Sequence, residues 1–219
     1  MILKKTVIFD MDGLMFDTEF LVEEGWDFAG QKLGVGKLGY MISKTLGVNA
    51  EKTKEIFFEE FGDKVDIDEL TRHTREYVYD YYAKNGVPVK PYLQKLLEYL
   101  KENGYKMAVA SSSRRQSVMH HLENTKVVDY FDAIICGDMI EHSKPAPDIY
   151  LKAAEELNVN PEECYALEDS PNGIRSAKSA GMKVIMVPDM IKPTEDIKSL
   201  LDAEFEDLGQ VIQYLKNEF

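Results

Sequence analysis

Short apolar runs recur along the chain, once near its start and four times after residue 100. They are rich in Val, Ile and Ala and lack the apolar–polar alternation of a half-buried strand. Runs of this kind are typical of strands that are buried on both faces of a parallel sheet. We therefore predict strands at residues 6–9, 107–110, 133–136, 165–167 and 184–187.

Segments with helical spacing lie between these runs. Leucines in residues 92–103 recur every three or four positions, and Gly104 follows as a typical helix end. Residues 149–157 and 174–180 show the same pattern. Strands that alternate with helices predict an α/β fold with a doubly wound parallel sheet.

The interval between the first and second predicted strands is far longer than one crossover needs. Residues 18–86 carry helical patterns and no β-like run. A structureless loop of that length is unusual in a compact domain. We therefore predict an inserted α-helical domain at residues 17–87 and an α/β core domain formed by residues 1–16 and 88–219.

Charge and hydropathy exclude several classes of partner. The chain of 219 residues has a net charge of −13, so its surface repels nucleic-acid backbones and anionic lipids. No apolar stretch approaches the ~20 residues of a membrane span. The apolar run at the start is too short for a signal peptide and meets Asp10 at once. We expect a cytoplasmic monomer that binds neither nucleic acid nor membrane.

Chemically capable side chains follow the predicted strands. Ligands of open α/β sheets bind beyond the carboxyl ends of the strands, so these side chains should converge there. They would bring four carboxylates and one ammonium together, and like charges so close raise one another's pKa unless a cation lies between them. Oxygen ligands of strong negative charge suit Mg²⁺, the cofactor we predict. The residues concerned are Asp10, Asp12, Ser111, Lys144, Glu168 and Asp169.

This set of residues can perform phosphoryl transfer. A carboxylate at a stiff strand end, Asp10, can attack phosphorus and form an aspartyl-phosphate. Asp12 lies two residues further on, where it can serve as the general acid and base for the leaving oxygen. Ser111 can donate a hydrogen bond to a phosphoryl oxygen, and Lys144 can neutralise its charge.

Four motifs in this order resemble those of the haloacid dehalogenase superfamily of phosphotransferases. They are FDMDG at residues 9–13, ASSS at 110–113, SKPAPD at 143–148 and LEDSPNGI at 167–174. The resemblance covers the whole chain. It implies a Rossmann-like core, and the helical insertion is similar to the type-one cap of that family.

The resemblance also implies roles for individual residues. Asp10 would be nucleophile and metal ligand, and Asp12 would be acid/base and bind the metal through its backbone carbonyl. Asp169 would bind Mg²⁺, and Glu168 would do so directly or through water. Ser111 and Lys144 would hold the phosphoryl group, with Ser113 and Arg114 beside the phosphate entrance.

Departures from the family pattern refine the expected activity. Halide-removing members lack the second aspartate, so Asp12 favours phosphate esters. The chain resembles β-phosphoglucomutase-like phosphatases most, but Val22 replaces the mutase's cap histidine four residues after the threonine that matches Thr18. The mutase's cap arginine also has no clear counterpart, and spacing places Asn49 near that position. Both absences favour hydrolysis over phosphate transfer.

Two cap residues complete the expected substrate-binding set. Thr18 matches the mutase's threonine, although a hinge or helix-cap role is the alternative. His73 matches a cap lysine when residues are counted back from Pro91, and its alternative is an ordinary solvated helix position.

We predict a phosphoric monoester hydrolase, a Mg²⁺-dependent phosphatase that acts on a small phosphorylated metabolite, and the metabolite we expect is a sugar phosphate. The first alternative is a β-phosphoglucomutase-type phosphomutase. The second is a non-catalytic signalling domain that stores phospho-aspartate. The acid at Asp12 and the inserted lid argue against the second alternative, because a signal store needs neither.

Overall fold

A computed structural model describes residues 6–218 and contains a six-stranded, all-parallel sheet. The predicted doubly wound α/β fold with an inserted helical cap is confirmed. The strand order is β3-β2-β1-β4-β5-β6. The strands are β1 (Thr6–Phe9), β2 (Lys106–Ser111), β3 (Ala133–Cys136), β4 (Cys164–Glu168), β5 (Lys183–Met186) and β6 (Ala203–Glu204).

Strand β1 occupies the centre of the sheet. Phe9 pairs with Val109 of β2 on one side and with Leu167 of β4 on the other. From β1 the chain first builds β2 and β3 outward on one side and then returns to build β4, β5 and β6 on the other. The reversal of direction falls between β1 and β4, which is the usual ligand crevice of open α/β sheets.

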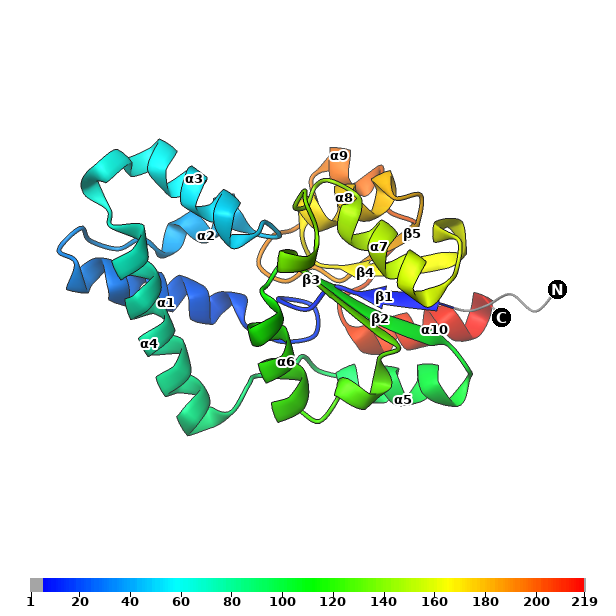
Figure 1. The fold of residues 1–219 in the computed structure, drawn as a ribbon. Coiled ribbons are helices and arrows are strands. Elements are labelled where there is room, and N and C mark those ends of the chain that lie inside the picture. The colour runs from blue at the N-terminus through cyan, green and yellow to red at the C-terminus, as the bar shows by residue number, and fades with distance from the viewer. Residues whose placement is uncertain (1–5, 219) are drawn as a thin grey trace.

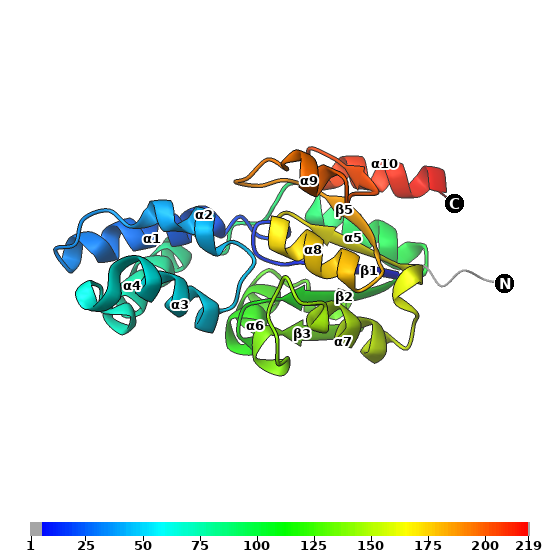
Figure 2. The same ribbon diagram turned by 90° about the horizontal axis from the view of Figure 1, so that it is seen from above.

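Helices cover both faces of the sheet (Figures 1 and 2). Val7 and Phe9 pack on one hydrophobic core and Ile8 on the other, so both faces of β1 are fully buried. This explains why the strand sequences show no polar alternation. One face is covered by α5 (Leu93–Glu102), α6 (Arg115–Asn124) and α10 (Leu208–Glu218), and the other by α7 (Asp148–Leu157), α8 (Pro171–Ser179) and α9 (Glu195–Lys198).

The segment between β1 and α5 folds into helices beside the sheet and forms a hydrophobic core of its own (Figure 1). At its centre the ring of Trp26 meets that of Phe57 edge to face at 5.0 Å. The domain boundaries at residues 17 and 87 stay a prediction, and residues 1–5 and 219 of the predicted core lie outside the described part. The cap helices are α1 (Glu19–Lys32), η1 (Gly39–Met41), α2 (Ile42–Thr45), α3 (Ala50–Phe61), η2 (Gly62–Lys64) and α4 (Ile67–Asn85).

The chain passes between the sheet domain and the helical cap twice, and the two linkers are hydrogen-bonded to each other. The amide of Asp17 donates to the carbonyl of Pro88 at 2.9 Å, and the amide of Lys90 donates to the carbonyl of Met15 at 2.9 Å. The outgoing and returning linkers therefore form one short two-stranded connection to the cap.

The sequence pattern missed the last strand and the last two helices. Strand β6 has two residues and no apolar run, so no periodicity announces it. Short 3₁₀ turns were also not predicted; those of the core are η3 (Val128–Tyr130), η4 (Gly137–Met139) and η5 (Pro161–Glu163). Within residues 6–218 no helix is both long and apolar enough to cross a membrane.

Candidate active site

Asp10 lies at the carboxyl end of β1 and is 7% exposed. Its amide donates to the carbonyl of Leu167 at 3.0 Å, which continues the pairing with β4 and fixes the backbone. Its Oδ1 accepts a hydrogen bond from Lys144 Nζ at 2.5 Å. Burial raises the pKa of Asp10 to about 8 against the opposing effect of Lys144.

Lys144 is the ammonium at the centre of the site. Its side chain is fully buried, and its Nζ also lies 2.6 Å from Glu168 Oε1. The adjacent ring of Tyr150 has its centroid 5.1 Å from the same nitrogen. Burial lowers the pKa of Lys144, but Asp10 and Glu168 together raise it above its ordinary value, so the group stays charged.

Glu168 ends β4 and has its carboxylate oxygens occupied within the protein. Oε1 accepts from Tyr150 as well as Lys144, and Oε2 accepts from the amide and hydroxyl of Ser170. The carboxylate lies against Gly173 in the first turn of α8, where a Cβ would come within 1.8 Å of Oε1. Only glycine therefore lets helix α8 approach the carboxylate this closely, a requirement that the sequence motif alone did not explain.

Asp169 has a buried carboxylate with no hydrogen-bond partner among residues 6–218. It is 4% exposed, and burial together with the charges of Asp10 and Glu168 raises its pKa well above the ordinary value. Ligand oxygens of these three residues all lie within 4.8 Å of one another. An unpaired buried carboxylate beside two others calls for a cation, and an all-oxygen set fits Mg²⁺.

Gly13 leaves room for this cluster. It has a φ of +84°, and a Cβ at this position would lie 2.3 Å from Asp169 Oδ2. A side chain here would therefore both strain the backbone and displace the carboxylate.

Asp12 is held apart from the three-carboxylate cluster by hydroxyl groups. Its Oδ1 accepts from Thr18 at 2.9 Å, and its Oδ2 accepts from Ser113 at 2.8 Å and from Ser111 at 3.3 Å. Three donors orient one carboxyl group, and they come from both linker and core. In this structure Thr18 and Ser113 thus position Asp12 as well as line the adjacent pocket.

The cap rests directly on the core above these residues. The hydroxyl of Ser112 donates to the carbonyl of Gly47 at 3.0 Å, and the side-chain amide of Asn172 donates to the carbonyl of Leu46 at 2.9 Å. An exposed ion pair joins Arg114 to Glu51 at 3.2 Å. The loop between α2 and α3 therefore covers the entrance.

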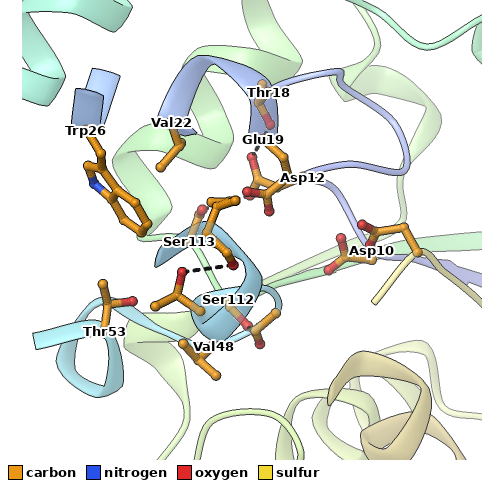
Figure 3. A pocket seen from close by; sticks show the side chains of 14 residues that line it. Asp10, Asp12, Thr18, Glu19, Val22, Trp26, Val48, Thr53, Ser112 and Ser113 are labelled. Atoms are coloured by element: carbon orange, nitrogen blue, oxygen red, sulfur yellow. Dashed lines mark hydrogen bonds between the residues drawn. The ribbon is translucent and has the colours of Figure 1, made fainter. Parts of the chain in front are cut away.

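A pocket of about 170 Å³ lies between cap and core (Figure 3). Asp10, Asp12 and Asp169 line it from the core, and Trp26 and Thr53 stand on the opposite side from Asp10. The cap contributes a carboxylate too, since Glu19 lines the pocket. Burial raises the pKa of Glu19 well above the ordinary value, and the charges of Asp12 and Asp10 add to this effect. Sequence reasoning did not identify Glu19 as a site residue.

Two predicted substrate-binding residues lie away from this pocket. His73 contacts Arg72 at 2.8 Å and Glu76 at 3.1 Å along α4 and does not line the pocket. Helix phase agrees with this position, because Thr71 and Arg75, each two residues from His73, line a neighbouring cavity that shares Trp26 and Thr53 with the pocket. Arg114 lines a neighbouring cavity of about 190 Å³ at the outer edge of the cap loop.

Comparison with known proteins gives a consistent assignment. A family model described as haloacid dehalogenase-like hydrolase matches residues 7–187. YhcW of Bacillus subtilis, provisionally named a phosphatase, is 34% identical, and the match covers 98% of this chain and 99% of that protein. The phosphorylated carbohydrates phosphatase of Thermotoga maritima is 30% identical, with 91% of each chain covered.

A solved structure supports the same grouping. The crystal structure of CbbY from Rhodobacter sphaeroides in complex with phosphate superposes with a TM-score of 0.79 at 27% identity, and the match covers 94% of this chain and 96% of that one.

Proposed function

Because the chain belongs to the haloacid dehalogenase-like hydrolases, we propose that it is a Mg²⁺-dependent phosphatase of small phosphorylated metabolites that works through an aspartyl-phosphate. One observation carries the proposal. Two buried carboxylates, those of Asp10 and Glu168, pair with one ammonium, and a third, that of Asp169, lies beside them without a partner. A fourth carboxyl, that of Asp12, is oriented separately by three hydroxyl groups. This arrangement separates a nucleophile from an acid/base, as two-step phosphate hydrolysis requires.

The residues fit a divalent cation. Asp10 and Asp169 would hold it through carboxylate oxygens, Asp12 through its backbone carbonyl, and Glu168 indirectly, because its own oxygens are already hydrogen-bonded. When bound, the ion neutralises charge on the carboxylates and the phosphoryl oxygens.

The first step transfers the phosphoryl group to the protein. A carboxylate oxygen of Asp10 attacks phosphorus, and the bond from phosphorus to the substrate oxygen breaks. Asp12, protonated, gives its proton to that leaving oxygen, so the product departs as an alcohol. Lys144 and the hydroxyl of Ser111 offset the negative charge that the phosphoryl oxygens carry.

The second step regenerates the enzyme. Asp12, now a carboxylate, removes a proton from a water molecule that attacks the phosphorus of the aspartyl-phosphate. The bond from phosphorus to Asp10 breaks and inorganic phosphate leaves. The cap loop above Ser112 limits the entry of other water molecules.

The pocket favours a small hydroxylated substrate. Its volume of about 170 Å³ suits a metabolite and excludes a macromolecule. Thr45, Thr53, Glu19 and Trp26 line the part that would receive the alcohol portion. Both threonine hydroxyls donate to the carbonyl four residues earlier, so towards a ligand they can act as acceptors. Acceptors beside an aromatic face suit the hydroxyl groups of a sugar phosphate, and a relative is named for phosphorylated carbohydrates.

Val22 favours hydrolysis over a mutase reaction. It lies one helical turn after Thr18 and lines the pocket, at the position where the resemblance places the mutase's histidine. An aliphatic side chain there cannot exchange protons with a bound sugar.

The monomeric state and cytoplasmic location stay predictions.

Asp10→Asn tests the proposal. We expect loss of p-nitrophenyl phosphate turnover by at least about a thousandfold, because an amide is not a nucleophile here. Wild-type turnover should disappear with EDTA and return with Mg²⁺. Asp80→Asn, an exposed carboxyl paired with Lys84 on the cap, is the matched control and should retain full activity. Activity that survives in Asp10→Asn would refute the assignment of the nucleophile. A panel of sugar phosphates then identifies the substrate class.

A further inference from the structure

Lys90 joins three segments of the chain at the base of the cap. Its Nζ lies 3.0 Å from Asp17 Oδ1 in the outgoing linker and 2.5 Å from Asp189 Oδ1 in the loop after β5. The Lys90 side chain is 19% exposed and that of Asp189 is 13% exposed, whereas that of Asp17 is 45% exposed. Burial lowers the pKa of Lys90, but both carboxylates raise it above the ordinary value, so the ammonium persists. We call these two ion pairs of Lys90 the clamp, and its two carboxylates thus differ in burial.

Lys90 contacts only one carboxylate oxygen of Asp189, Oδ1. Oδ2 is buried and has no hydrogen-bond partner among residues 6–218. Leaving a buried carboxylate oxygen unpaired is costly, so a simple structural ion pair does not account for its position.

Gly13 shows where this oxygen lies. A Cβ on Gly13 would be 2.3 Å from Asp169 Oδ2 and 3.3 Å from Asp189 Oδ2. Both oxygens therefore border the same small space, and one of them belongs to the carboxylate cluster. The charge of Asp189 also reaches into the site, since it contributes to the raised pKa of Glu19.

A hydrated cation would satisfy the unpaired oxygen. Mg²⁺ usually retains several water molecules when it binds to carboxylates. Groups outside the ligand set that accept hydrogen bonds from such waters hold the ion in place, and their loss typically weakens metal binding about 10- to 100-fold.

We propose that Asp189 accepts a hydrogen bond from a water molecule on the Mg²⁺ ion and that Lys90 positions Asp189 for this role. The inference rests on the proposed function, because it assigns the ion to the cluster at Asp169. It makes metal affinity depend on a lysine in the returning cap linker. By thermodynamic linkage, bound Mg²⁺ in turn favours the arrangement in which both linkers are clamped.

Isothermal titration calorimetry of the full chain with Mg²⁺ tests the proposal without any substrate. Asp189→Asn should raise the Kd for Mg²⁺ about tenfold, and Lys90→Met should raise it in the same direction. Lys90→Arg, which keeps the charge, should stay within about twofold of wild type. In turnover assays, Asp189→Asn should raise the Mg²⁺ concentration needed for half-maximal rate and leave kcat at saturating Mg²⁺ nearly unchanged.

Asp17→Asn is the matched control. It removes a carboxylate from the same lysine, but Asp17 is more exposed, and within residues 6–218 its carboxylate is hydrogen-bonded only to Lys90, so the Kd of this variant for Mg²⁺ should stay within about twofold of wild type. Equal weakening in Asp17→Asn and Asp189→Asn, or no change in Asp189→Asn, would overturn the proposal. Thermal midpoints in EDTA identify any variant that fails to fold. If Asp189→Asn fails to fold, the Kd of Lys90→Met for Mg²⁺ tests the proposal in its place.

The outcome for wild type separates this proposal from the proposed function. A wild-type chain that binds no Mg²⁺ contradicts the metal-dependent phosphatase itself. A wild-type chain that binds Mg²⁺ and an Asp189→Asn variant that binds it equally well contradict only the role of Asp189.

Discussion

Replacement of Lys144 by Met removes the ammonium from the centre of the site. Its Nζ contacts Asp10 at 2.5 Å and Glu168 at 2.6 Å, and its side chain has no exposed surface. Methionine is unbranched and flexible, so it can occupy the same channel beside Tyr150 without a large cavity. The substitution therefore changes charge far more than packing.

The expected cost follows from the burial of both partners. Removing one member of a buried ion pair typically costs about 3–5 kcal/mol, whereas a domain of this kind has about 5–15 kcal/mol of stability in total. Lys144→Met should therefore fold but unfold at a markedly lower urea concentration. Surface pairs do not behave this way, and Lys152→Met, which breaks exposed pairs with Glu155 and Glu156, should cost about 1 kcal/mol or less.

The cost should also depend on pH. Burial places the pKa of Asp10 at about 8 with Lys144 present, far above its ordinary value of 3.8. Without the ammonium this pKa rises further, so the folded variant keeps its proton to higher pH than the folded wild type. Above pH 8 both the unfolded chain and the folded wild type have lost that proton, so the stability of the wild type levels off. The folded variant still holds the proton, so its stability continues to fall as the pH rises. The difference between them should be smallest at pH 6 and grow above pH 8.

Urea unfolding in EDTA at pH 6, 7.5 and 9 measures these differences. Far-UV circular dichroism follows the whole chain, and the fluorescence of Trp26, the single tryptophan, follows the cap separately. Wild-type stability for Lys144→Met at every pH would refute the reasoning, because it would mean that the buried carboxylates do not need the ammonium. A difference that shrinks as pH rises would refute the assigned direction of the Asp10 shift.

Three further variants test other parts of the site. Gly173→Ala should destabilise the protein by about 1–3 kcal/mol and reduce turnover, because its Cβ would come within 1.8 Å of Glu168 Oε1; unchanged urea unfolding and activity would contradict this packing. Asp169→Asn should abolish most of the rise in thermal midpoint that Mg²⁺ gives the wild type, and a full rise would exclude this residue as a ligand. Burial lowers the pKa of His121, which lies beside Asp12, His120 and Tyr82. The unfolded chain therefore binds a proton at this residue more readily than the folded chain, and stability falls as the pH drops below 6.5. His121→Asn should flatten that fall between pH 7.5 and 5.5 in urea unfolding, and an unchanged slope would contradict the assignment.

The positions of the core site residues could be predicted because each one follows a strand. Asp10, Ser111 and Glu168 stand at or next to the ends of β1, β2 and β4, and parallel strands in register bring their carboxyl ends to one edge. Local pattern and chain direction were therefore enough to predict that these groups converge. Lys144 was placed in the same cluster by the same reasoning, because it follows the third strand, β3, which ends at Cys136.

The cap was harder to interpret from sequence. His73 was matched by counting residues, and a single step along a helix turns a side chain by about 100°. Glu19 entered the site because α1 starts at this residue against the core, which no local pattern shows. Helical periodicity predicts that a segment is a helix, but it does not say which side of that helix will face a distant surface.

The sequence by itself determined the first five strands, the order of chemical groups at their ends and the presence of a helical insertion, because these depend on spacing within a few residues. Only the tertiary structure decided which oxygen atoms are satisfied and which are left for a cation. Asp189 meets Lys90 across 99 positions of the chain, and Gly173 contacts the Glu168 carboxylate only because α8 packs back onto β4. Such contacts depend on how whole elements pack, and packing is a property of the folded chain rather than of any local stretch.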